Sequence, residues 1–211
     1  MIALNEIEAR ILGCLIEKEY TTPEHYPLTL NSLVAACNQK SNRNPVTSFD
    51  EETVEKGLEG LNQKGLANAV YTPGSRTVKY RHSFLEAFKL IPREAAILCE
   101  LMLRGRQTAG ELRGRADRVS KLNDIQEVEY TLKDLMERAE PLVVKLKREA
   151  GRKEPRHMHL LSGLPEQQPA KEEAEANTEI RTVRLEEDIS ALKSELEALK
   201  KAFEEFKSKF E

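Results

Sequence analysis

The sequence predicts a mainly helical α+β fold, in which a unit of three helices and a two-stranded hairpin occurs twice and is followed by a separate C-terminal helix. Charged residues make up 33% of the chain, apolar residues 39%, and tryptophan is absent, a composition typical of a well-solvated helical protein. Apolar residues recur at the spacing of one helix face. The same apolar pattern occurs twice in the same order. An all-β fold is disfavoured.

The internal repeat consists of three pairs of matching segments. In each pair, apolar residues occupy the same helical positions and the flanking polar residues correspond. The pairs are, in chain order, Glu8–Leu12 with Glu94–Leu98, Thr29 and Leu33 with Thr108 and Leu112, and Val54, Leu58 and Leu61 with Val128, Leu132 and Leu135. Because the order is the same in both halves, the sequence predicts a duplicated unit.

Helix boundaries are predicted from capping signals. At four helix starts a polar side chain is followed three residues later by Glu or Gln, so that each side chain caps the backbone of the other. The four pairs are Asn5 with Glu8, Ser48 with Glu51, Thr108 with Glu111, and Asn123 with Gln126. Pro92 is tolerated in the first turn of a helix, whereas Gly65 and Gly105 suit helix ends.

A predicted hairpin ends each unit. Residues 66–71 and 76–82 flank a Pro73–Ser75 turn, and residues 142–147 and 156–161 flank a charged loop. Alternating apolar and polar residues are typical of half-buried strands. Three helices followed by a hairpin are the layout of a winged-helix domain, a variant of the helix-turn-helix.

The predicted organisation has four parts. Residues 1–83 and 84–165 form two tandem winged-helix domains, residues 166–177 an acidic linker, and residues 178–211 a coiled-coil helix. We expect each winged-helix half to close a small core of its own. One continuous α+β domain over both halves is the alternative.

The C-terminal helix has a heptad pattern, which indicates a coiled coil. Its apolar positions are Leu185, Ile189, Leu192, Leu196, Leu199, Phe203, Phe206 and Phe210. In a parallel pair Asp188 faces Lys193, and Glu195 faces Lys200, which favours a homodimer through this helix. The alternatives are a helix that folds back on its own body and, because phenylalanine is unusual at these positions, docking on another protein.

Four segments resemble the YceH family of uncharacterised bacterial proteins. They are Leu4–Arg10, Thr21–Leu28, Ala36–Val46 and Met158–Gly163, of which the run containing Cys37-Asn38-Gln39-Lys40 is long and specific. The resemblance spans almost the whole chain. It implies tandem winged helices and brings no established activity, so function has to be inferred from the residues.

Apolar runs are short, and this indicates a cytoplasmic protein. The longest, near Ile11–Ile16, is far below the ~20 residues of a membrane span, so no membrane association is expected. Cys14, Cys37 and Cys99 are odd in number and lie among apolar residues. Reduced, buried thiols are therefore predicted.

Acidic residues on the predicted third helices argue against base reading. A winged helix normally places its third helix in the major groove, where Arg, Lys, Asn and Gln read base edges. The third helix of the first half instead contains Asp50, Glu51, Glu52, Glu55 and Glu59 with Lys56. The third helix of the second half contains Asp124, Glu127, Glu129, Asp134 and Glu137 with Lys133 and Arg138. Each carboxylate near a phosphate opposes binding by about 1 kcal/mol in water.

Basic residues lie instead near the second helices and on the wings, where they could contact a phosphate backbone without reading sequence. The candidates are Lys40, Arg43, Arg76, Lys79, Arg81, Arg104, Arg106, Arg113, Arg115, Arg118, Lys145, Lys147, Arg148, Arg152, Lys153 and Arg156. One hypothesis is a regulator that contacts double-stranded DNA through these residues and is dimerised by its C-terminal helix. The other is a protein-interaction module or scaffold that does not bind DNA. For any single arginine, ordinary surface ion pairing is the alternative.

No motif for catalysis or for a cofactor is found, so a non-enzymatic protein is expected. The sequence has no phosphate-binding glycine loop and no zinc-ligand spacing. His157 and His159 lie on one face of a predicted strand, where two surface histidines are expected rather than a metal site. The polar run Asn38–Asn44 has two interpretations that remain open: hydrogen bonds that bridge helices, or a small anion or peptide site.

Overall fold

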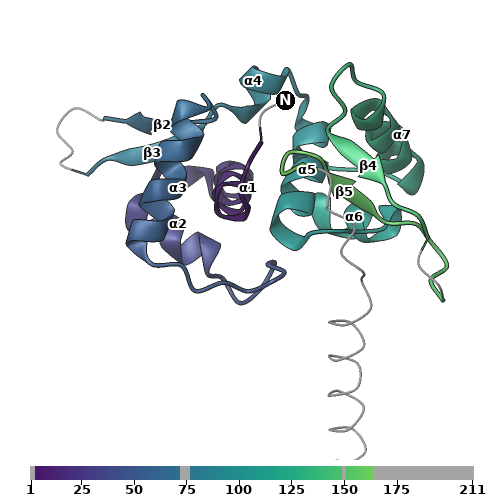
Figure 1. Ribbon diagram of the computed structural model, residues 1–211, viewed down its shortest axis with the longest axis horizontal. Helices are drawn as coiled ribbons and strands as arrows, with labels where there is room; N and C mark the ends of the chain where they lie inside the picture. Colours follow the sequence, from purple (N-terminus) through teal and green to yellow (C-terminus); the bar gives the residue numbers. More distant parts are fainter. Residues whose placement is uncertain (1–2, 72–76, 149–150, 164–211) are drawn as a thin grey trace, which may run out of the picture. The chain divides into compact units, whose positions relative to one another are not determined.

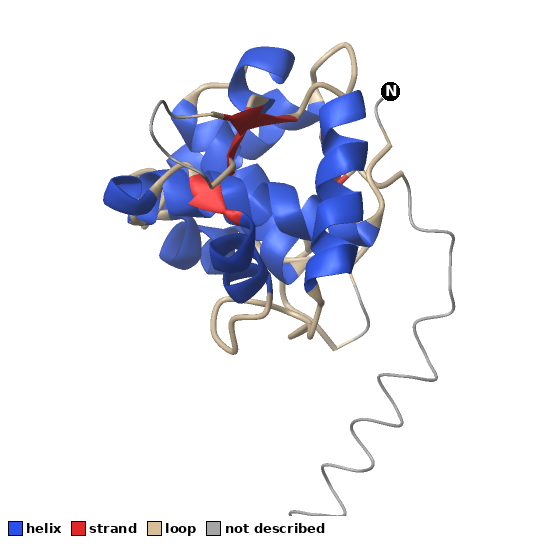
Figure 2. Cartoon of the chain, turned by 90° about the vertical axis from the view of Figure 1, so that its left-hand side faces the viewer, coloured by secondary structure: helices blue, strands red, loops and turns tan. Residues whose placement is uncertain are grey.

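The computed structural model describes residues 3–71, 77–148 and 151–163, which belong to a compact unit formed by Met1–Leu164. Helices dominate it, and the strands are short (Figure 2). The helices are α1 (Glu6–Thr21), α2 (Leu30–Cys37), α3 (Glu51–Gln63), α4 (Phe84–Phe88), α5 (Pro92–Arg104), α6 (Ala109–Ala116) and α7 (Ile125–Met136), with a 3-10 turn at Pro23–His25. The strands are β1 (Leu28–Thr29), β2 (Ala67–Val70), β3 (Lys79–His82), β4 (Val143–Lys145) and β5 (His157–His159). A mixed, mainly helical fold is confirmed.

The two halves repeat the same order of elements. In the first half α1, α2 and α3 precede an antiparallel pair, β2 and β3, and in the second half α5, α6 and α7 precede the antiparallel pair β4 and β5 (Figure 1). A feature that the sequence analysis missed is β-pairing before the second helix of each half. In the first half β1 pairs with β3, giving the order β1-β3-β2, and in the second half Gln107 forms an isolated antiparallel bridge with His157.

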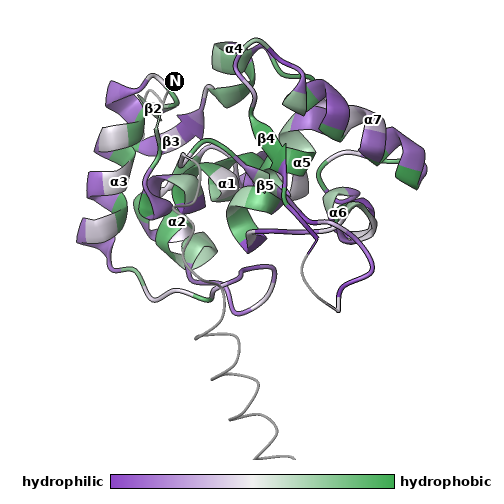
Figure 3. Ribbon diagram, turned by 45° about the vertical axis from the view of Figure 1, so that its right-hand side comes forward, coloured by the Kyte–Doolittle hydropathy of each residue, from purple (hydrophilic) through white to green (hydrophobic). Residues whose placement is uncertain are grey.

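The helices α1 and α5 form the centre of the unit, where they pack against each other (Figure 1). Ten consecutive residues of each helix are buried, Glu8–Glu17 in α1 and Glu94–Leu103 in α5. Hydropathy colouring shows apolar residues along α1 and α5, whereas polar residues dominate α3 and α7 (Figure 3). The core therefore surrounds two central helices.

One hydrophobic core spans both halves. Buried side chains of the first half, such as Ile11 and Leu61, belong to the same cluster as Leu98 and Leu132 of the second half. The expectation that each half closes its own core is therefore wrong. The physical reason is that ten consecutive residues of each central helix are buried, and α1 and α5 pack against each other as well as against the elements of their own halves. The division at residue 83 remains a prediction about the repeat.

The central helices approach each other closely at Gly13. A Cβ atom at this position would lie 2.9 Å from Leu103 Cδ2 and 3.3 Å from Met102 Cβ. The Cys99 thiol donates a hydrogen bond to the Gly13 carbonyl oxygen at 3.3 Å. Cys99, Cys14 and Cys37 are free and buried, as predicted.

Two of the four predicted capping pairs are confirmed. Asn5 with Glu8 and Thr108 with Glu111 form reciprocal capping boxes. The pairs Ser48 with Glu51 and Asn123 with Gln126 are wrong, because the caps are Asp50 and Asp124, whose carboxylates accept from the backbone three residues later. An aspartate at the cap position adds a favourable interaction with the helix dipole.

No helix among the described residues is long and apolar enough to cross a membrane. The predicted linker at 166–177 and coiled-coil helix at 178–211 lie outside the described residues, as does the tip of the first hairpin at 72–76.

Candidate functional site

The polar segment Asn38–Asn44 bridges helices through hydrogen bonds. The Asn38 side chain makes two hydrogen bonds to the backbone of Phe49, each at 2.7 Å. Its Nδ2 donates to the Phe49 carbonyl oxygen, and its Oδ1 accepts from the Phe49 amide. Arg10 of α1 donates to the carbonyl oxygens of Cys37 and Pro45 at 3.2 and 2.7 Å. The contacts favour the bridging interpretation of this segment.

Arg43, within the same segment, is the centre of a buried ion network. Its guanidinium binds both carboxylate oxygens of Glu17, at 3.1 and 2.5 Å, and its Nε donates to the Ala36 carbonyl oxygen at 3.0 Å. Burial opposes ionisation of both groups, but the hydrogen bonds and opposite charges outweigh it: the pKa of Glu17 is lowered and that of Arg43 is raised. Both side chains are therefore charged.

The network continues into the second half. Arg118 contacts Glu17 at 2.6 Å and Glu100 of α5 at 2.8 Å. Arg104 pairs with Glu100 at 3.0 Å and also donates to the Asn42 side chain. Three of the candidate arginines, Arg43, Arg104 and Arg118, thus compensate two buried carboxylates. We therefore interpret them as structural groups that join the halves.

A second group of candidates gathers on the second half. The backbones of Gln107 and His157 exchange two hydrogen bonds, at 3.0 and 2.7 Å, which places the start of α6 beside β5. Arg156 donates to the Arg106 carbonyl oxygen at 3.3 Å, and Arg115 donates to the Gln107 side chain at 2.7 Å.

The β4–β5 hairpin adds further basic residues to this group. Leu146 donates its amide to the Arg156 carbonyl oxygen at 2.8 Å, and Lys147, Arg152 and Arg156 line one small pocket with Glu154. These contacts place five basic residues on adjoining elements, and they are defined here as the basic cluster: Arg106, Arg115, Lys147, Arg152 and Arg156.

The remaining candidates are more dispersed. In the second half Arg148 and Lys153 are exposed on the hairpin, Arg113 donates to the Asn123 carbonyl oxygen, and Lys145 lines a groove beside α7. In the first half Lys40 and Arg81 are exposed and Lys79 is half-buried. Arg76 lies outside the described residues.

The third helices turn their acidic side chains outward. In α3, Val54, Leu58 and Leu61 are buried, and Glu51, Glu52, Glu55 and Glu59 are exposed. In α7, Val128, Leu132 and Leu135 are buried, and Glu129 and Asp134 are exposed, as is Glu137 at the C-cap. The outward faces that would enter a major groove are therefore acidic in both halves.

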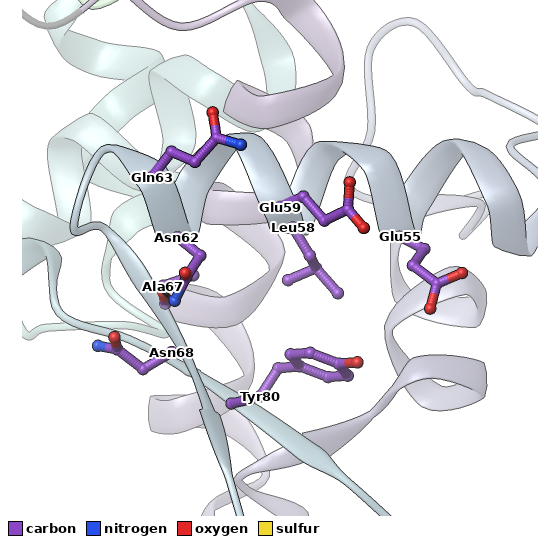
Figure 4. A pocket seen from close by; sticks show the side chains of 9 residues that line it. Glu55, Leu58, Glu59, Asn62, Gln63, Ala67, Asn68 and Tyr80 are labelled. Carbon is purple, nitrogen blue, oxygen red and sulfur yellow. Dashed lines mark hydrogen bonds between the residues drawn. The ribbon is translucent and has the colours of Figure 1, made fainter.

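A groove lies between the third helix and the hairpin in each half. The first, of about 330 Å³, lies between α3 and the β2–β3 hairpin and is lined by Glu55, Leu58, Glu59, Asn62, Gln63, Ala67, Asn68, Ala69 and Tyr80 (Figure 4). The second, of about 500 Å³, lies between α7 and the β4–β5 pair and is lined by Ala109, Ile125, Glu129, Leu132, Lys133, Met136, Lys145, Glu154, Pro155 and His157. Periodicity predicted the helices but not these grooves.

His157 and His159 are buried, so the expectation of surface histidines is wrong. Their exposed fractions are 6% and 8%, because the strand face that they share packs against the core rather than toward solvent. Burial lowers the pKa of both rings, to about 4 for His159. No group of three side chains suited to hold a metal ion occurs among the described residues.

The fold and its polar bridges thus define a duplicated α+β protein with two buried central helices and a basic cluster on its second half. The chain belongs to the family described as "Protein of unknown function, DUF480", whose model matches residues 4–152. This confirms the family resemblance drawn from the sequence.

Several relatives cover most of the chain. It is 52% identical over 200 residues to a UPF0502 protein of Pelobacter propionicus, an alignment that covers 91% of each chain. It is 56% identical over 163 residues to a UPF0502 protein of Citrifermentans bemidjiense, which covers 77% of this chain and 75% of the relative. A UPF0502 protein of Geotalea uraniireducens is 50% identical over 200 residues, with 90% of each chain covered.

Proposed function

We propose that both halves are winged helices and that the protein is a cytoplasmic, non-enzymatic binding protein. The support lies in the order of elements: a helix, a short strand or bridge, two further helices and a hairpin occur in each half. In the first half, the strand between the first two helices pairs with the second strand of the hairpin. This pairing is the arrangement expected of a wing.

Within this frame, we propose that the second half binds the phosphate backbone of double-stranded DNA. The observation that carries the proposal is the basic cluster: α6, the segment before it and the β4–β5 hairpin adjoin one another and carry five basic residues. Clustered Arg and Lys bind phosphates by releasing condensed counterions, without reading sequence. The acidic outward faces of α3 and α7 argue against base reading by a third helix.

We further propose that the C-terminal helix dimerises the chain through its heptad positions, which would place two basic clusters in one particle. Two linked sites raise the overall affinity when both can reach the same duplex. Light scattering of the full chain tests this part: the expected mass is that of a dimer, and a monomer at tens of micromolar would contradict it.

A salt titration tests DNA binding. The full chain is mixed with a fluorescein-labelled 20-base-pair duplex, and anisotropy is followed from ~50 to ~200 mM salt, because each lost phosphate contact lowers the log-log slope by about 0.9. The variant Lys147→Ala/Arg152→Ala/Arg156→Ala is expected to reduce the slope by about 2 to 3.

The matched control removes three basic residues from the first half, Lys40→Ala/Lys79→Ala/Arg81→Ala. It is expected to change the slope by less than about 1. No binding of the wild-type chain at ~50 mM salt would contradict the proposal, as would an equal effect of the two triple variants.

A further inference from the structure

We propose that the groove between α3 and the β2–β3 hairpin is a docking site for an extended, basic segment of a partner protein. This acidic groove is defined by Glu55, Leu58, Glu59, Asn62, Ala69 and Tyr80 (Figure 4). It lies in the first half, away from the basic cluster in sequence and opposite to it in charge. The inference is therefore independent of DNA binding.

The negative charge of the groove favours a cationic ligand. Glu55 and Glu59 lie one turn apart on α3 and are exposed, and neither has an ion-pair partner among the described residues. Glu52 on the same helix, in contrast, pairs with Lys56 at 2.5 Å. Figure 4 shows the Glu55 and Glu59 carboxylates at the rim of the groove. Among the residues that the structure describes, no basic side chain lines the groove, so the carboxylates are available to an incoming Lys or Arg.

The floor of the groove favours apolar side chains beside the basic ones. Leu58 and the ring of Tyr80 face each other across it (Figure 4), and Ala67 and Ala69 also line it. The Tyr80 pKa is raised by burial and by the nearby Glu55 carboxylate. A volume of about 330 Å³ is at the small end of the ~300 to 1,000 Å³ of ligand pockets. It therefore suits a few side chains of an extended segment rather than a whole helix.

The strand beside the groove is open to pairing. In the order β1-β3-β2, strand β2 lies at the edge of the sheet. Ser83 donates its amide to the Leu66 carbonyl oxygen at 2.9 Å, and the register continues with Ala67 opposite His82 and Ala69 opposite Tyr80.

Hydrogen-bonded and non-hydrogen-bonded pairs alternate along antiparallel strands, so the backbone groups of Ala67 and Ala69 point away from β3. The Asn62 side chain donates to the Ala67 carbonyl oxygen at 3.1 Å. Ala69 therefore offers an amide and a carbonyl to an added strand, the mode called β-augmentation.

The equivalent groove of the second half is a natural comparison. On the repeat alignment Leu58 corresponds to Leu132 and Glu55 to Glu129, but Glu59 corresponds to Lys133. The second groove contains Lys133 and Lys145 beside Glu129 and Glu154, so its charges are balanced. Of these two grooves, the first therefore has the charge that favours a cationic segment.

Fluorescence anisotropy of a labelled peptide tests the proposal. The probe is a fluorescein-labelled eight-residue peptide of alternating lysine and valine, titrated with the full chain. The variant Glu55→Gln/Glu59→Gln keeps the shape of the groove and removes its charge. It is expected to weaken binding at least tenfold, whereas binding of the 20-base-pair duplex stays within twofold of wild type.

Two controls match this variant. Glu51→Gln/Glu52→Gln removes the same charge from α3 outside the groove, and Glu129→Gln removes the corresponding carboxylate of the second groove; both are expected to leave peptide affinity within twofold. An equal loss in the Glu51→Gln/Glu52→Gln variant would overturn the proposal, because it would show attraction to overall charge only. Equal binding of a glutamate-valine peptide would overturn it as well.

Amide hydrogen exchange tests the strand addition. Saturating lysine-valine peptide is expected to slow exchange of the Ala69 amide at least tenfold, with no matching change at Val143–Lys145. Unchanged exchange at Ala69 with saturated peptide would overturn docking on β2, even if the affinities followed the charges. Protection of Ala69 by the duplex instead would assign the groove to nucleic acid and also overturn the proposal.

Discussion

Removing the Arg43 guanidinium is predicted to destabilise the protein by about 3 kcal/mol. The side chain is buried and makes hydrogen bonds to Glu17, Ala36, Asn42 and Gln39. Removing one partner of a buried pair costs about 3 to 5 kcal/mol, because it leaves an uncompensated charge. Arg118 remains as a second partner of Glu17 at 2.6 Å, which places the Arg43→Ala variant at the lower end of this range.

Urea unfolding at pH 7 measures this loss directly. A change of about 3 kcal/mol also corresponds to a decrease in Tm of about 6 to 12 °C for a chain of this size. The pH dependence adds a second check. The folded-state pKa of Glu17 is lowered, so its contribution is present above the unfolded-state value of ~4.3 and is lost as pH falls through the folded-state value.

The wild type is therefore expected to lose more stability than Arg43→Ala below about pH 4. A loss of less than about 1 kcal/mol in the variant at pH 7 would refute the reasoning, because it would assign the pair the energy of an exposed salt bridge.

Three further changes are expected to alter stability. Gly13→Ala should destabilise the protein by about 1 kcal/mol in urea unfolding, because the added Cβ would lie 2.9 Å from Leu103. The control Gly114→Ala has open space around its Cβ and should stabilise by about 0.5 to 1 kcal/mol. A stabilised Gly13→Ala variant would show that α1 and α5 are not closely packed. The folded-state pKa of His159 is about 4, below the unfolded-state value of ~6.5, so the wild type should lose about 3 kcal/mol of unfolding free energy as pH falls from 8 to 4. In the His159→Leu variant this loss should be absent. An unchanged pH profile of stability in the variant would contradict the prediction. Asn38→Ala should lower the free energy of unfolding by about 1 to 3 kcal/mol, because two hydrogen bonds to the Phe49 backbone are lost. Thermal unfolding measures the loss, and Ser41→Ala, at an exposed neighbour, provides the control.

The duplication was predictable because its signals are local. Apolar spacing in Val54–Leu61 and Val128–Leu135 identified both third helices, and the short side chains of Asn5 and Thr108 identified two helix starts. The shared core was not predictable in this way. A helix that is buried on several faces, such as α1, contains charged residues whose partners are far along the chain, as Glu17 and Arg43 show.

The candidate site was predicted in part. The sequence placed basic residues near the second helices and on the hairpins, and five of them lie on adjoining elements of the second half. It could not separate Arg43 and Arg118, which compensate buried carboxylates, from Lys147 on the surface. The sequence also did not determine whether His157 and His159 face the core or solvent. Alternation shows that two side chains share one face of a strand, but it does not show which face meets the core.

Chemical-shift mapping of the isotope-labelled full chain with a 20-base-pair duplex is the most direct test of the central claim. The account predicts perturbed amides around Arg106, Arg115 and Arg156 and at Lys147, and unchanged amides along the outward faces of α3 and α7. Perturbation centred on α3 or α7, with an unchanged basic cluster, would contradict the account.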